Sequence, residues 1–135
     1  MNGYSEVLLI AIYHFEAKVI SRGTGRSVVA AAAYASCSRI YNDYDGVTHD
    51  YTKKHGNLYS EVFLPSTAPP EWQDRSELWN AVEEAEKTKD SRLAREMIFA
   101  LPIELELYDW KTMLKDFIKE DCTDKGMCAD VSIHD

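Results

Sequence analysis

Residues 21–40 read SRGTGRSVVAAAAYASCSRI, and this stretch decides how the rest of the chain is interpreted. A basic turn with two glycines precedes Ser27, which is a favourable N-cap, and the alanines that follow are strong helix formers. The sequence therefore predicts a helix from Ser27 to about Tyr41. Its first turn offers backbone N–H groups and the positive end of the helix dipole, which suit a phosphate. From their charge and position, we expect Arg22 and Arg26 to contact nucleic-acid phosphates.

Tyr34 lies in the middle of this predicted helix, two turns after the cap. On spacing alone, a tyrosine in an alanine-rich helix is more often a packing residue. The functional alternative is a nucleophile that forms a covalent phosphotyrosine, provided that a base, a metal ion or arginines stabilise its phenolate. The residues themselves leave both interpretations open.

The chain has 135 residues, of which 45% are hydrophobic, so it fits a single domain (1–135) with one core. The longest apolar run, Val7–Ile12, is too short to span a bilayer, and no basic segment of a secretory signal precedes it. Cys37, Cys122 and Cys128 are odd in number and lack CxxC spacing. They indicate free thiols in a reducing cytoplasm, not a disulfide framework or a zinc site.

The net charge of −8 argues against a general nucleic-acid binder, because phosphate contacts dominate that affinity. The charge is uneven along the chain. Residues 1–60 hold six Lys/Arg and five Asp/Glu, whereas residues 61–135 hold nine and eighteen. A nucleic-acid face is therefore expected in the first half of the chain.

The remaining hydrophobic patterns predict an α+β fold with a mostly antiparallel sheet, in the order β-α-β-β-α-β-α-β. The predicted strands are Val7–Ile20, Val47–Tyr51, Leu58–Leu64, Ser91–Leu101 and Met127–His134, and the further helices are Asp74–Lys89 and Tyr108–Asp121. Val47–Tyr51 and Leu58–Leu64 are expected to form a hairpin.

Two details of these elements bear on a site. In the first strand, Ala17 and Val19 alternate with a polar stripe of His14, Glu16 and Lys18, which is either solvated or used for binding. In the helix of residues 74–89, capped by Asp74 or Ser76, we place Glu83 on or beside the exposed side, paired with Lys87.

Glu96 and His134 are weaker candidates for chemistry. Glu96 sits on a short, otherwise apolar strand, where a carboxylate acts as a base or orients another group. A surface pair with Arg92 or Arg95 explains it equally well. His134 ends the last strand, on the same face as Asp130 and Ser132, and a lone histidine is usually not a metal ligand.

Several sequence blocks in order closely resemble the N-terminal half of the MobA/MobL relaxases, the relaxase domains of TraA-like plasmid transfer proteins. The blocks are IYHFEAKVISRGTGRSVVAAAAYASCSRI, HDYTKK, SEVFLP, DRSELWNAVEEAEKTKDSRLAREMIFALP and GMCADVSIHD. The resemblance runs from about Ala11 to Asp135. It implies a five-stranded antiparallel sheet with helices and a histidine cluster that holds a divalent metal.

The resemblance also implies roles for individual residues. Tyr34 would attack the scissile phosphate of single-stranded origin-of-transfer DNA and form a 5′-phosphotyrosyl link. Glu96 would help to activate Tyr34, and His134 would be the first of three ligands of Mn²⁺ or Mg²⁺. The implied partners are the origin DNA and other relaxosome proteins, with no membrane.

The sequence departs from the family pattern at both ends. The family continues into a proline–histidine–x–histidine segment with two further metal ligands, before which this sequence ends, and residues 1–10 precede the usual family start. We therefore expect an incomplete metal site and a truncated gene product. The alternative to a relaxase is a non-catalytic remnant that binds DNA or a partner; a protein-interaction domain accounts for neither the tyrosine block nor the ARE block.

Overall fold

The computed structural model of the chain describes residues 15–86, 88–89, 91–100 and 105–135. In these ranges the strands are β1 (Phe15–Ser21), β2 (Arg39–Asn42), β3 (Val47–Asp50), β4 (Asn57–Phe63), β5 (Arg92–Phe99) and β6 (Ala129–His134). The α-helices are α2 (Val28–Ser36), α3 (Arg75–Ala85) and α4 (Leu107–Asp121). The observed order adds β2 to the predicted one.

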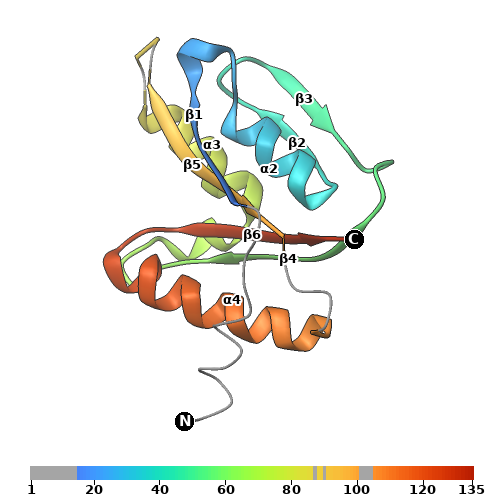
Figure 1. Cartoon of the computed structure of the whole chain (residues 1–135). Coiled ribbons are helices and arrows are strands. Elements are labelled where there is room, and N and C mark those ends of the chain that lie inside the picture. The colour runs from blue at the N-terminus through green and yellow to red at the C-terminus, as the bar shows by residue number, and fades with distance from the viewer. Residues whose placement is uncertain (1–14, 87, 90, 101–104) are drawn as a thin grey trace.

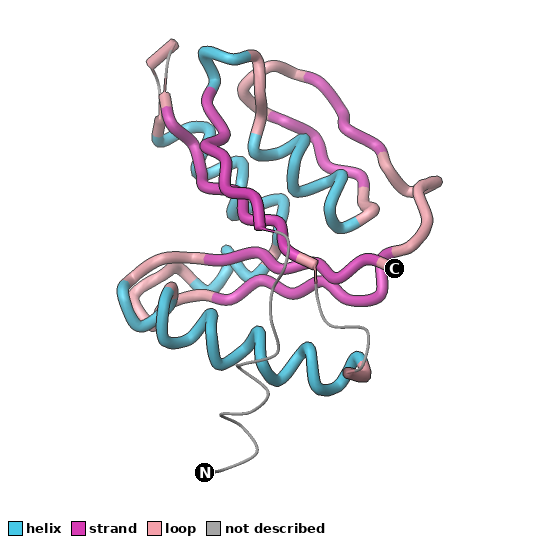
Figure 2. The backbone as a smooth tube through the Cα atoms, viewed as in Figure 1, coloured by secondary structure: helices cyan, strands magenta, loops and turns pink. Residues whose placement is uncertain are grey.

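The strands pair in three separate antiparallel ladders, β1 with β5, β2 with β3, and β4 with β6 (Figure 2). The predicted α+β class and antiparallel pairing are confirmed. The predicted hairpin of Val47–Tyr51 with Leu58–Leu64 is wrong, because β3 pairs with β2 instead. The turn between them is fixed by Asp45, which accepts a hydrogen bond from the Val47 N–H, and by Gly46 at φ 73°.

The β4–β6 ladder is the middle layer of the fold, with α4 on one side and α2, α3 and the other ladders on the opposite side (Figure 1). On the α4 side, the Lys111 ammonium lies 4.6 Å from the Tyr59 ring centroid. On the other side, Asp130 and His134 contact α3 and α2. Asp130 and His134, on the polar face of the last strand, therefore connect the two halves of the fold.

Helix α2 contributes side chains to two hydrophobic clusters. Val29, Ala32, Ala33 and Ile40 form one, and Ile20, Val28 and Leu93 form the other, with the Trp79 side chain against both. The small alanine side chains let β2 and α3 approach the helix closely, which explains why this run decides the fold.

Helix α2 ends at Ser36, and the predicted end near Tyr41 is wrong. Cys37 takes the left-handed conformation at φ 54°, and the N–H of Ser38 bonds the Ala33 carbonyl. The reversal starts β2 and buries Ile40 against the helix. No glycine marks this C-cap, which is why the sequence pattern missed it.

The other helices follow the prediction more closely. Asp74 is the N-cap of α3, and its side chain accepts hydrogen bonds from the N–H groups of Ser76 and Glu77. Helix α3 ends at Ala85, short of the predicted Lys89. Helix α4 matches its predicted range within one residue. None of the helices in the described ranges has the length and apolar character needed to cross a membrane.

The first strand differs from its predicted amphipathic pattern. Its predicted part before residue 15, with His14, lies outside the described residues. In β1, Ala17 and Val19 are exposed, although the alternation placed them on the apolar face. Ile20 on the opposite face is 4% exposed and packs with Val28 and Leu93, because α2 and α3 cover that end of the ladder.

Candidate active site

Tyr34 stands on the face of α2 that the core leaves uncovered. Its side chain is 53% exposed, whereas Ala33 beside it is completely buried. The Tyr51 ring meets the Tyr34 ring edge to face, with centroids 5.2 Å apart and an interplanar angle of 83°. The Tyr34 ring is thus held on one side and open to solvent on another, an arrangement unlike that of a core packing residue.

A cation lies directly against the Tyr34 ring. The Lys54 Nζ is 4.2 Å from the ring centroid, and it is 3.3 Å from Nδ1 of His134. Lys54 belongs to the loop after β3, Tyr34 to α2 and His134 to the end of β6. Three segments far apart in the sequence therefore converge at the C-terminal end of α2.

The His134 ring is oriented by the helix backbone. Its Nε2 lies 2.7 Å from the Ala35 carbonyl oxygen, which also accepts a hydrogen bond from the Asn57 amide. Because a carbonyl oxygen only accepts, Nε2 carries the proton and Nδ1 accepts from the Lys54 ammonium. A histidine whose other ring nitrogen is held by a backbone carbonyl has the usual support of a metal ligand.

The described residues do not complete a divalent metal site around His134. They hold no group of three histidine, cysteine or acidic side chains placed to bind one ion. In addition, the nitrogen of His134 that has a lone pair faces Lys54. One imidazole alone is a poor divalent site, so the described ligands fit a divalent metal only in part.

Glu96 on β5 pairs with Arg26. The Arg26 guanidinium donates to both carboxylate oxygens at 3.3 and 3.4 Å, and the two side chains are 37% and 28% exposed. The expected alternatives, Arg92 and Arg95, are thus replaced by a partner from the basic turn. Within the described residues, Glu96 shares no hydrogen bond with Tyr34, so its predicted role toward the tyrosine stays a prediction.

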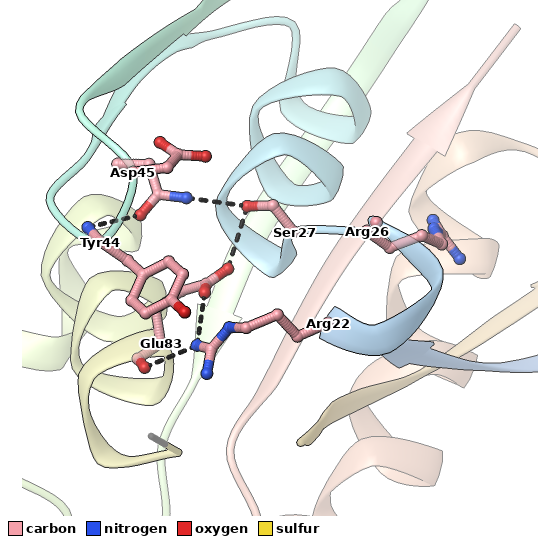
Figure 3. A pocket seen from close by; sticks show the side chains of 8 residues that line it. Arg22, Arg26, Ser27, Tyr44, Asp45 and Glu83 are labelled. Carbon is pink, nitrogen blue, oxygen red and sulfur yellow. Dashed lines mark hydrogen bonds and ion pairs between the residues drawn. The ribbon is translucent and has the colours of Figure 1, made fainter. Parts of the chain in front are cut away.

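The N-terminus of α2 is filled by a carboxylate of the protein itself, which corrects the expectation of a phosphate there. Glu83 Oε1 accepts from the Val28 N–H and from the Ser27 hydroxyl, both at 3.0 Å. Glu83 is 2% exposed, so its predicted position on or beside the exposed side of the helix is wrong. Figure 3 shows the carboxylate between Ser27 and Arg22.

Arg22 is the counter-ion of Glu83 and caps the end of α3. Its guanidinium donates to the Glu83 carboxylate at 2.9 Å and to the backbone carbonyls of Glu83, Glu86 and Thr88. The Tyr44 ring covers the guanidinium, with the Arg22 Cζ 3.9 Å from the ring centroid (Figure 3). With 10% of the side chain exposed, Arg22 faces the protein, and its placement does not support the expected DNA contact.

A small cavity of about 130 Å³ lies beside this network. Its lining includes Ser27, Asn42, Glu83 and the Arg22 side chain, whose Nε is buried without a hydrogen-bond partner in the described structure. The Asn42 amide donates to the Ser27 hydroxyl at 3.1 Å. The basic turn is therefore a structural junction between α2, α3 and the β2–β3 turn.

Two residues are central here that the sequence did not place correctly: it gave Lys54 no role, and it put Glu83 on the wrong side of its helix. Lys54 stands in the HDYTKK block, but nothing in a polar loop indicates which lysine folds back onto a helix. Glu83 had a readable signal, because Arg75, Trp79 and Glu83 form one i, i+4 row on α3. Trp79 and Arg75 both bond Asp130, so this row faces the interior.

Comparison with protein families gives a match over most of the chain. A model of the MobA/MobL family matches residues 26–135. Among individual proteins, the conjugal transfer protein TraA of Rhizobium radiobacter is 41% identical over 93% of this chain. The mobilization protein MobL of Acidithiobacillus ferridurans is also 41% identical over 93% of the chain. The chain spans 12% and 32% of the length of these relatives, respectively.

A solved structure has the same fold. It comes from work on the molecular basis of vancomycin resistance transfer in Staphylococcus aureus. It superimposes on this chain with a TM-score of 0.85 at 37% sequence identity. The match covers 93% of this chain and 63% of that one. At this level of identity, the likeness extends beyond the fold to a shared ancestry.

Proposed function

The chain belongs to the MobA/MobL relaxase family, and we propose that it nicks one strand of origin-of-transfer DNA through Tyr34. The observation that carries the proposal is the half-exposed tyrosine on α2, with a lysine against its ring and an oriented histidine beside that lysine. The relatives named as conjugal transfer and mobilization proteins support the process. The partners would be single-stranded DNA and other relaxosome proteins in the cytoplasm, and residues 1–135 would form part of one relaxase domain.

The proposed step exchanges one phosphate ester for another. The Tyr34 oxygen forms a bond to phosphorus while the bond between phosphorus and the DNA 3′ oxygen breaks. The phenolic proton leaves to a base, and the departing 3′ oxygen gains a proton. The products are a 5′-phosphotyrosyl link and a free 3′-OH, and because the number of phosphate esters is unchanged, the reverse step rejoins the strand.

The remaining site residues have narrower proposed roles. Arg26 would contact the DNA backbone, since more than a third of its side chain is exposed next to Glu96. Glu96 would assist Tyr34, as the family resemblance implies. His134 would supply one ligand to Mn²⁺ or Mg²⁺, which would polarise the phosphate when bound.

The test is covalent capture. The chain is incubated with a single-stranded oligonucleotide that spans the origin of transfer of its plasmid, with Mn²⁺ or Mg²⁺ present, and adducts are separated on a denaturing gel. We expect an adduct whose DNA-linked peptide contains Tyr34, and none in the Tyr34→Phe variant. Tyr108→Phe is the matched control, because Tyr108 is 77% exposed on α4, away from the site.

Absence of the adduct from a folded wild-type sample would contradict the enzymatic proposal for this chain. Binding of the same oligonucleotide by that sample would then favour the non-catalytic DNA-binding alternative. An adduct that persists in Tyr34→Phe would assign the chemistry to another side chain.

A further inference from the structure

We propose that Lys54 binds the phosphate that Tyr34 attacks. The inference rests on the proposed nicking function and adds a residue to it. It starts from a charge that the described structure leaves unbalanced beside the candidate nucleophile.

The Lys54 ammonium has no counter-ion in the described part of the chain. Its recorded contacts are the face of the Tyr34 ring and Nδ1 of His134, and both are uncharged in the hydrogen-bonding arrangement described above. The side chain is half-buried, so it has lost part of its hydration. A partly desolvated cation without a carboxylate partner is stabilised by a bound anion.

The two arginines of the basic turn both have carboxylate partners. Arg22 is neutralised by Glu83, and Arg26 pairs with Glu96. The first turn of α2 is occupied by Glu83 and by the Ser27 side chain. The helix N-terminus is thus occupied by the protein, and both arginines are paired with carboxylates, whereas Lys54 has no carboxylate partner among the described residues and contacts the Tyr34 ring.

The loop holds Lys54 in place before any ligand binds. The Tyr51 N–H bonds the Ser38 carbonyl at 3.0 Å, and the Lys54 N–H bonds the Tyr51 carbonyl at 3.0 Å. Asp50 closes the preceding turn by accepting from both the N–H and the hydroxyl of Thr52. Because the backbone of this loop is attached to the end of α2, the ammonium is positioned and not merely nearby.

The donor geometry leaves room for a phosphate. An ammonium carries three N–H donors, and His134 Nδ1 accepts one of them. Two donors remain for non-bridging phosphate oxygens. An oxygen bound there would bring phosphorus next to the tyrosine, whose ring the same ammonium already contacts.

The test measures DNA binding in the full chain with Tyr34→Phe as background, so that no cleavage intervenes. The probe is the single-stranded origin oligonucleotide, and a set of copies each carries one uncharged methylphosphonate at a different position. We expect Lys54→Ala to weaken binding about tenfold and to lower the slope of log affinity against log salt by about 0.7, the value for one phosphate contact on a single strand. Lys54→Arg should retain most of both.

The decisive comparison uses Lys53→Ala as the matched control, because Lys53 is an exposed lysine in the same loop. At one position, the methylphosphonate should weaken DNA binding by the Lys53→Ala protein. It should have no effect on the Lys54→Ala protein, because that variant has already lost the contact between Lys54 and this phosphate. That position should coincide with the nick mapped from the Tyr34 adduct. If Lys54→Ala lowers the melting temperature, the same measurement is made with Lys54→Gln, which keeps most of the side-chain length without the charge.

The outcomes separate the two proposals. If the background protein binds the origin oligonucleotide no better than a scrambled one, the proposed function fails and the Lys54 assignment with it. If it binds the origin selectively, but Lys54→Ala and Lys53→Ala respond alike to every methylphosphonate, only the Lys54 assignment fails.

Discussion

The two ends of helix α2 treat charge in opposite ways. At its N-terminus, Glu83 and Arg22 are 2% and 10% exposed and satisfy each other and the helix backbone. At its C-terminal end, Tyr34 is 53% exposed and Lys54 has no carboxylate partner among the described residues. The first end binds α3 to α2, and the second is open to a ligand.

This difference shows why a helix N-terminus in a sequence is not by itself an anion site. The dipole and the N–H groups attract any anion, and a carboxylate on a neighbouring helix is always present at high effective concentration. The informative feature is a charge that the fold leaves uncompensated. Here that charge lies at the end of α2 where the dipole gives no help to an anion.

The largest effect is expected when the closed end is broken. Glu83→Ala would leave the buried Arg22 without its counter-ion and the Val28 N–H without its acceptor, and we expect the free energy of unfolding to fall by about 3–5 kcal/mol. Urea unfolding at neutral pH measures it. Glu84→Ala on the exposed side of α3 is the control, with a change within about 0.5 kcal/mol. Equal effects of the two variants would show that the network is not structural.

A smaller effect is expected at the link between the two halves of the fold. Asp130 accepts two hydrogen bonds from Arg75 and one from the Trp79 indole, and so attaches β6, with His134, to α3. Asp130→Asn should cost roughly 1.5–3 kcal/mol in urea unfolding. Asp124→Asn removes an exposed pair with Lys119 and should cost less than about 1 kcal/mol. The reverse order would contradict the assignment.

The open end should tolerate a stabilising change. Cys37 caps α2 at φ 54°, a left-handed conformation that strains most residues other than glycine. Cys37→Gly should therefore raise the free energy of unfolding by about 0.5–1 kcal/mol, which thermal unfolding detects as a higher midpoint. Cys37→Ala keeps the strain and serves as the control. A lower midpoint for Cys37→Gly would mean that the cysteine side chain itself stabilises this end.

The smallest effect concerns acid stability of the loop that carries Lys54. Hydrogen bonds from the hydroxyl and N–H of Thr52 lower the pKa of Asp50 below its ordinary value of 3.8. Since the folded-state pKa is depressed, this contribution to stability is present above the unfolded value and is lost as the pH falls through the folded one. Asp50→Asn should slightly flatten the loss of stability between about pH 4 and pH 2. Circular dichroism of the variant and the wild type across that range measures the difference, and identical pH profiles would contradict it.

The elements with strong periodicity were predictable. The range of helix α4 was predicted within one residue, and Asp74 was one of the two N-caps predicted for α3, because amphipathic stripes and N-cap chemistry are local. The pairing of β2 with β3 was missed because the end of α2 depends on Cys37, which has no typical cap signature. Strand pairing depends on where a helix stops, so one local error changed the predicted hairpin.

The sequence alone determined the family, the α+β class and the candidate nucleophile, because ordered blocks around Tyr34 carry that information without coordinates. Only the tertiary structure decided which charges are used for folding and which remain for a ligand. Glu83 and Lys54 are both charged residues in polar surroundings of the sequence, and their fates differ because α3 packs against the start of α2 while the β3 loop folds onto its end. Compensation between charges far apart along the chain is a property of packing, which local patterns do not contain.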